Sequence, residues 1–194
     1  MKSITVFCGS SNGLKNNYRH QAFLLGEALA QKGIQLVYGG ANVGLMGAVA
    51  DGALSRKGRV VGILPEFLQK KELAHKGITE LHIVETMHQR KTKMHDLSDG
   101  FIALPGGFGT LEELFEIITW AQLGLHKKPI GLLNIDGFYN HLVLLLAQMV
   151  DNGLLKQINR DMLLVDQDIN GLIEQMHAYE APTVGKWISS EEKV

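Results

Sequence analysis

The sequence predicts a single α/β domain in which helices cover both faces of a doubly wound parallel sheet. Three observations favour this fold class. The 194 residues, 45% hydrophobic and 20% charged, suit one globular core. Short apolar segments alternate with longer segments of helical period, which is typical of βαβ units around a buried sheet. Many of the 22 glycines stand directly after the apolar segments, where such a fold binds its ligands.

The expected strands are brief, mostly hydrophobic segments at residues 4–8, 35–38, 60–64, 81–85, 101–104, 130–133 and 163–165. The expected helices carry apolar residues three to four positions apart, and several end near a glycine suited to a C-terminal cap. They are residues 18–31, 44–57, 87–98, 110–123, 138–152, 156–160 and 169–179. Residues 65–79, charged and poorly periodic, are expected to form a connection or a short irregular helix, and residues 186–194 a loose tail of the same domain.

The net charge limits which partners the protein can attract, and the cysteine content indicates its compartment. A net charge of −1 provides no field that would attract nucleic acid or an anionic membrane, so any phosphate must be held locally. The single cysteine, Cys8, indicates a reducing compartment, and the N-terminal segment resembles neither a signal peptide nor a membrane span. The sequence therefore predicts a cytoplasmic protein.

Three glycine-rich loops follow expected strands: CGSS at residues 8–11, GGANVGLMG at 39–47 and PGGFGT at 105–110. Because parallel strands place their carboxyl ends along one edge, these loops are expected to meet there. Ser10 and Gly40 are therefore expected to contact a ligand. The second loop does not match GxGxxG and no GxxxxGK[ST] is present, so neither a dinucleotide nor P-loop phosphoryl transfer is favoured.

The segment PGGFGTLEE predicts a phosphate site. Its glycines would expose backbone N–H groups, and Thr110 and the start of the next helix would add a hydroxyl and the positive end of a helix dipole. Glu112 and Glu113 are expected in the first turn of that helix, close to the anion. Two structural alternatives exist: the glycines could serve only the turn, and the carboxylates could only compensate the dipole.

The segment MHQRKTKM, residues 87–94, begins another expected helix. Basic residues at a helix N-terminus oppose its dipole, so Arg90 and Lys91 are better placed for an anionic or purine ligand than for stability. A solvated basic face is the alternative. Nothing indicates covalent catalysis or a metal, because Cys8 is expected to be a buried structural thiol and the eight histidines lack metal-ligand spacing.

PGGFGTLEE and HQRK, preceded by VFCGSS and YGGANVGLMG, together resemble the LONELY GUY family, whose older label is possible lysine decarboxylase. The resemblance covers about residues 4–169. It implies a Rossmann-like fold, a dimer or larger assembly, and hydrolysis of cytokinin riboside 5′-monophosphates, with AMP accepted by some members. It also implies catalytic roles for Arg90 and Glu113. The implied nucleotide contacts are Glu72, Arg90, Lys91, Gly107, Phe108, Gly109, Thr110, Leu111, Glu112, Glu113 and Thr119.

The chemistry of that reaction fits these residue types. Cleavage of a ribosyl C1′–N9 bond develops positive charge on the sugar and negative charge on the purine, so a carboxylate and a donor are needed. Glu113 would stabilise the ribosyl cation and orient or deprotonate water, while Arg90 would steady the leaving purine or the phosphate. No metal or organic cofactor is required, and the expected partner is a purine nucleoside 5′-monophosphate.

Two rival classes remain open from sequence. A purine nucleotide sensor or carrier would use the same phosphate loop without turnover, and a pyridoxal-phosphate decarboxylase would need a Schiff-base lysine with a partner for the pyridine nitrogen. No such pair stands out.

The helices expected at 110–123 and 138–152 are apolar over more of their surface than one buried face requires, which predicts a homodimer. The apolar residues are Leu114, Phe115, Ile117, Ile118, Trp120 and residues 142–146.

Overall fold

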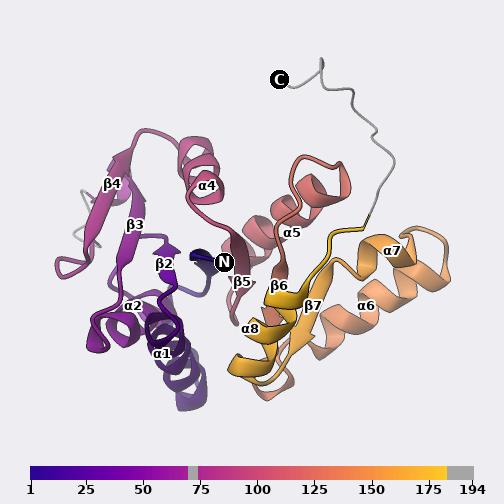
Figure 1. Cartoon of the computed structure of the whole chain (residues 1–194), viewed down its shortest axis with the longest axis horizontal. Coiled ribbons are helices and arrows are strands. Elements are labelled where there is room, and N and C mark those ends of the chain that lie inside the picture. Colours follow the sequence, from indigo (N-terminus) through magenta and orange to yellow (C-terminus); the bar gives the residue numbers. More distant parts are fainter. Residues whose placement is uncertain (70–73, 183–194) are drawn as a thin grey trace.

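The computed structural model describes residues 1–69 and 74–182, and these residues form one seven-stranded, all-parallel sheet. The strand order is β4-β3-β2-β1-β5-β6-β7 (Figure 1). The strands are β1 Ser3–Phe7, β2 Gln35–Tyr38, β3 Val60–Pro65, β4 Glu80–Val84, β5 Gly100–Ala103, β6 Ile130–Leu133 and β7 Leu163–Asp166. β1, β3, β5 and β6 are buried along their whole length, which explains why β3, β5 and β6 are apolar without alternation.

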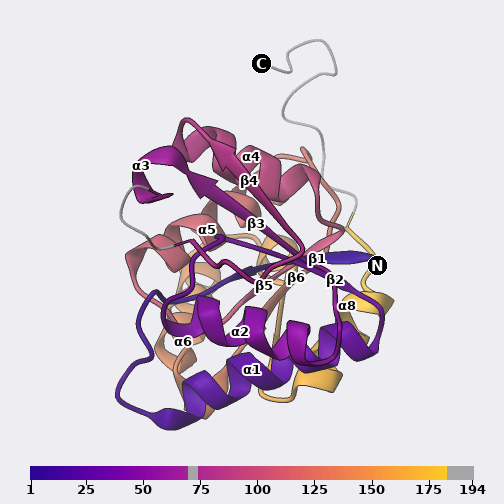
Figure 2. The same ribbon diagram turned by 90° about the vertical axis from the view of Figure 1, so that its left-hand side faces the viewer.

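Helices cover both faces of the sheet, as the sequence predicts. They are α1 Asn16–Gln31, α2 Gly44–Ser55, α3 Glu66–Gln69, α4 Met87–Asp96, α5 Phe108–Gln122, α6 Asn140–Asp151, α7 Gln157–Arg160 and α8 Ile169–Ala178. α1, α2 and α8 supply one hydrophobic cluster and α4, α5 and α6 the other. In Figure 2, α1 and α2 lie along one side of the sheet and α4 along the opposite side. None of the helices in this part of the chain has the length and apolarity that crossing a bilayer requires.

The strand order reverses between β1 and β5, and this places the site. From β1 the chain adds β2, β3 and β4 on one side, then returns to pair β5 with the other edge of β1. The loops that follow β1 and β5 therefore flank the switch point, where doubly wound sheets leave a crevice for ligands. These loops contact each other directly, because the Gly9 N–H donates to the Pro105 carbonyl at 3.1 Å.

Three helices begin two residues away from the expected start, and the first is α1, which begins at Asn16 rather than Tyr18. α5 begins at Phe108 rather than Thr110, with Gly107 as its extended N-cap, so Glu112 and Glu113 lie in the second turn. The start was hard to predict because Gly109 lies in the first turn and glycine has a low helix propensity. The helix expected at 138–152 begins at Asn140, after the 3-10 turn η1 Ile135–Gly137, where Asp136 has a φ of 52°.

Other bounds agree closely with the sequence. β2 and β6 have the expected limits, and in the segment at 65–79 the described residues 65–69 form the end of β3 and the short α3. The tail expected at 186–194 lies outside the described residues.

Candidate functional site

A cavity of about 420 Å³ lies beyond the carboxyl ends of the central strands. The loops after β1, β2 and β5 line it, together with side chains from α4 and α5. Its lining includes eight of the residues predicted from sequence: Ser10, Arg90, Gly107, Phe108, Gly109, Thr110, Glu112 and Glu113. A smaller cavity of about 310 Å³ adjoins it at Gly9, Ser10 and Gly107. The three glycine-rich loops thus meet at one edge, as their placement after strands predicts.

The start of α5 leaves backbone donors available at this cavity. Gly107 caps the helix without a side-chain hydrogen bond, and the first N–H groups of a helix have no partner within it. A Cβ at Gly107 or Gly109 would meet no atom of the described residues within 4 Å, and neither glycine has a positive φ. Packing therefore does not require glycine at these positions. A ligand that approaches the backbone closely would require it.

Thr110 lies beneath this loop. Its side chain is buried, and a Cβ at Gly106 would overlap the Thr110 hydroxyl, so only glycine at 106 permits this close packing. The Phe108 side chain is instead almost fully exposed at the rim of the cavity.

Arg90 and Glu113 form an ion pair within the cavity. Arg90 Nη2 lies 3.4 Å from Glu113 Oε1, and the two side chains are only 12% and 9% exposed. Arg90 Nε is buried without a hydrogen-bond partner in the described part of the chain. The guanidinium therefore retains donor capacity for a further anion or acceptor.

The start of α4 fixes where Arg90 emerges. Thr86 is the N-cap, and its hydroxyl accepts from the Gln89 N–H at 3.1 Å. The Gln89 side chain in turn accepts from the Glu85 N–H at 2.8 Å. These reciprocal bonds resemble a capping box and hold the first turn in place.

Burial raises the pKa of the Glu113 carboxyl, while the Arg90 charge acts in the opposite direction. A carboxylate in such surroundings is less well solvated than one in water, so it interacts more strongly with a cation that forms beside it. Cys8 lines the same cavity, and burial followed by the Glu113 charge raises the pKa of its thiol far above the usual range. The thiol therefore stays protonated and is a poor nucleophile.

Gly39 is a cavity residue that the sequence prediction missed. A Cβ at this position would overlap Arg90 Nη2 and approach Met46 Sδ. Glycine here thus lets the guanidinium lie against the backbone at the end of β2. The GGANVG segment contained this glycine, but only the fold shows which of its glycines faces Arg90.

Four other predicted contacts lie outside the cavity lining. Gly40 has a φ of 77° and turns the chain after β2. Leu111 packs against the α4–α6 core, and Lys91 is paired with carboxylates of α5. Thr119 is exposed, and its hydroxyl donates to the Phe115 carbonyl of its own helix at 2.7 Å. Glu72 lies outside the described residues.

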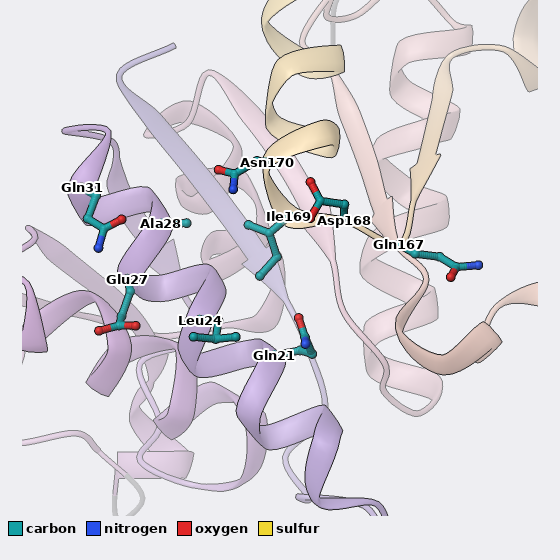
Figure 3. Close-up of a pocket in the computed structure, with 9 residues that line it drawn as sticks. All are labelled: Gln21, Leu24, Glu27, Ala28, Gln31, Gln167, Asp168, Ile169 and Asn170. Carbon is teal, nitrogen blue, oxygen red and sulfur yellow. The ribbon is translucent and has the colours of Figure 1, made fainter.

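A further cavity of about 520 Å³ lies between α1 and the start of α8 (Figure 3). Its polar lining consists of amides and two carboxylates, Glu27 and Asp168, without a lysine or arginine. The lining thus offers no positively charged side chain to an anionic ligand. The cavity at Arg90 is therefore the better candidate for a phosphate-bearing ligand.

Within residues 1–69 and 74–182, no three histidine, cysteine or acidic side chains are grouped so that they could hold a metal ion. The buried histidines form contacts with other protein groups instead. His126 contacts the Ile117 carbonyl at 2.9 Å and the Phe101 ring, and burial lowers its pKa to about 4. His126 is therefore neutral at physiological pH.

Comparison with known proteins finds relatives along most of the chain. The model of a family described as possible lysine decarboxylase matches residues 46–176. The cytokinin riboside 5′-monophosphate phosphoribohydrolase LOG7 of Arabidopsis thaliana is 48% identical over 180 residues, which cover 92% of this chain and 82% of that protein. The cytokinin riboside 5′-monophosphate phosphoribohydrolase of Rhodococcoides fascians is 49% identical over 173 residues, covering 89% and 87% of the two chains.

Solved structures share the fold at lower identity. The molybdenum cofactor binding protein from Rippkaea orientalis has a TM-score of 0.69 and 25% identity, covering 92% of this chain and 97% of that one. The molybdenum cofactor carrier protein from Chlamydomonas reinhardtii has a TM-score of 0.66 and 22% identity, covering 91% and 98%. This second likeness establishes a common architecture and nothing about ligands.

Proposed function

The chain belongs to the LONELY GUY family, and we propose that it hydrolyses the N-glycosidic bond of purine nucleoside 5′-monophosphates to free base and ribose 5-phosphate. One observation carries the proposal: the buried Glu113 carboxylate faces Arg90 in a cavity that also contains the donor-rich start of α5. Beside a phosphate, a buried carboxylate weakens the binding of an anionic nucleotide unless it accepts hydrogen bonds from the ribose. A glycosidase requires one, because the ribosyl group becomes cationic.

In the proposed reaction, the C1′–N9 bond breaks and water forms the new bond to C1′. The Glu113 carboxylate stabilises the positive charge on the sugar and orients or deprotonates the water. One proton of the water leaves with the purine and the hydroxyl stays on the ribose. The reaction balances with AMP and water alone and requires no cofactor.

Arg90 acts as a donor and not as an acid, because a guanidinium keeps its proton at neutral pH. Its unpartnered Nε and its position between Gly39 and Glu113 suit a donor to the departing purine or to the phosphate. Gly107, Gly109 and the first N–H groups of α5 bind the 5′-phosphate in this proposal.

The direct test is incubation of the protein with AMP followed by chromatography. Free adenine and ribose 5-phosphate in equal amounts support the hydrolase. AMP that binds tightly and is recovered intact would instead favour the sensor or carrier. A parallel assay of AMP and the N6-isopentenyl nucleotide, compared by kcat/KM, establishes which base the cavity prefers.

A decarboxylase dependent on pyridoxal phosphate would need a lysine in the cavity to form the Schiff base. Among residues 1–69 and 74–182, no lysine lines the cavity, and Lys91 is held by two carboxylates. We therefore expect a colourless protein that does not release carbon dioxide from lysine. The family description as a possible lysine decarboxylase thus has no support in the arrangement of these residues.

We also propose a cytoplasmic homodimer. Leu114, Ile117 and Leu146 are buried within the chain, so the apolar surface is smaller than the sequence predicts. The remaining exposed side chains include Phe115 of α5 at 37% and Leu144 and Leu145 of α6 at 60% and 47%. The free, buried Cys8 is consistent with a reducing compartment.

Light scattering of the wild-type protein at micromolar concentration is expected to give about twice the chain mass of 21.4 kDa. Leu144→Arg should lower that mass toward one chain, because a charge in an apolar interface would lose its hydration. Circular dichroism checks that the variant is folded. A wild-type mass near 21.4 kDa would contradict the dimer.

A further inference from the structure

Lys91 joins α4 to α5 immediately beside the proposed catalytic pair. Its Nζ lies 2.6 Å from Glu112 Oε1 and 3.0 Å from Glu116 Oε1. One turn further along both helices, the His95 and Trp120 rings meet edge to face at 5.3 Å. The side chains at these positions thus connect the helix that carries Arg90 to the helix that carries Glu113.

Lys91 is arranged as a connector and not as a ligand for the substrate. Its side chain is only 10% exposed, and it does not line the cavity. Burial acts to lower the pKa of its ammonium group, but the hydrogen bonds to Glu112 and Glu116 raise the pKa overall. Two carboxylates that already neutralise this charge leave little of it for a phosphate.

Of the two carboxylates, Glu116 is the one that can hold Lys91 firmly. The Glu112 side chain is 55% exposed, and an ion pair at such a position contributes little because water competes for it. The Glu116 side chain is 24% exposed, and its Oε2 is buried without a hydrogen-bond partner among the described residues. An unpartnered carboxylate oxygen costs stability, so stability alone does not account for glutamate at this position.

The consequence for the site follows from the register of the two helices. Lys91 is the residue after Arg90, and Glu116 lies three residues after Glu113, on the neighbouring part of the same helix face. A contact that fixes Lys91 against α5 therefore also fixes the distance from Arg90 to Glu113. That distance is 3.4 Å. On another side, the Arg90 guanidinium lies against the Gly39 backbone, which has no side chain.

We propose that Glu116 is a positioning residue of this site, which holds Lys91 and thereby keeps the Arg90 guanidinium at the Glu113 carboxylate. This inference rests on the proposed hydrolase function. Glu116 itself does not line the cavity and contacts none of the reacting atoms in this arrangement.

The pH dependence of turnover distinguishes this role from a direct charge effect. Burial raises the pKa of Glu113, Arg90 lowers it, and the charge of Glu116 raises it slightly. Among the described residues, the other groups facing Glu113 are Glu112 of α5, Lys91 of α4 and the Cys8 thiol after β1. Removal of the Glu116 charge alone would therefore lower the pKa of Glu113. Displacement of Arg90 would raise it.

The test is kcat for AMP as a function of pH in Glu116→Gln, which keeps the size of the side chain and removes its charge. We expect kcat to fall by about 10- to 100-fold, since misplacement of a catalytic group by about 1 Å can cost this much. We also expect the acid limb of the profile to move to higher pH, with little change in the thermal melting temperature. Glu116→Asp keeps the charge and should lie between Glu116→Gln and the wild type in both measurements.

Two variants serve as controls. Gly39→Ala pushes Arg90 away directly and should also move the acid limb to higher pH. Glu27→Gln removes another helix-to-helix ion pair, the 2.8 Å contact between Glu27 and Arg56, and should leave the profile unchanged. If Glu116→Gln retains wild-type kcat, or if its acid limb moves to lower pH, the positioning role is wrong. A wild-type protein that releases no adenine would overturn the hydrolase function itself.

Discussion

Replacement of Glu113 by glutamine is expected to lower kcat for AMP by about 10²–10⁴-fold, roughly 3–5 kcal/mol of barrier. Glutamine keeps the size of the side chain and its ability to accept a hydrogen bond, but it carries no charge opposite the ribosyl cation. The loss falls on the transition state because only there is the sugar cationic. Affinity for AMP should stay the same or improve, since the Glu113 carboxylate and the phosphate repel each other.

Steady-state kinetics and equilibrium dialysis of AMP with the variant measure the two quantities separately. Glu174→Gln is the matched control. Glu174 is exposed on α8, so this substitution removes the same charge at a position away from the cavity. In the wild type, turnover should be lost as the pH falls through the raised pKa of Glu113, because the carboxylate becomes protonated. A Glu113→Gln protein that retains wild-type turnover would remove this residue from the mechanism.

Much of the fold could be predicted because its signals are local. β6 is a short, fully buried apolar segment, β2 is buried from Leu36 to Tyr38, and both strands have the limits expected from sequence. The helix starts were harder to predict, because residues of low helix propensity often stand there. Gly107 and Gly109 indicate a loop by propensity, yet α5 begins between them at Phe108. Because packing requires glycine at neither position, we propose that the approach of a ligand, and not helix stability, favours these residues.

The site could be predicted only in part, because a motif identifies residue types but not their partners. Arg90 and Glu113 belong to segments 23 residues apart in sequence, and they do meet at 3.4 Å. The basic character of Lys91 suggested a phosphate contact, but its charge is taken up by Glu112 and Glu116. These carboxylates lie on a different helix, so sequence spacing could not reveal the pairing.

The 5′-phosphate is expected to be obligatory, with kcat/KM for adenosine about 10²–10⁴-fold below that for AMP. The start of α5 presents N–H groups without intrahelical partners, and Gly107 and Gly109 leave room for an anion to approach them. A hydrogen bond to a charged group contributes about 1.5–3 kcal/mol, so two of them account for this range. Ribose 5-phosphate should inhibit AMP hydrolysis competitively, whereas ribose should not.

Gly109→Ala tests where this phosphate binds. In the part of the chain that the structure describes, the added methyl group meets no atom within 4 Å, and alanine is preferred over glycine in helices by up to about 1 kcal/mol. The variant should therefore be at least as stable as the wild type toward thermal unfolding. Its KM for AMP should nevertheless rise about 10-fold or more, because the methyl group occupies the approach to the backbone N–H groups. An unchanged KM, or comparable kcat/KM values for adenosine and AMP in the wild type, would show that this loop has another purpose.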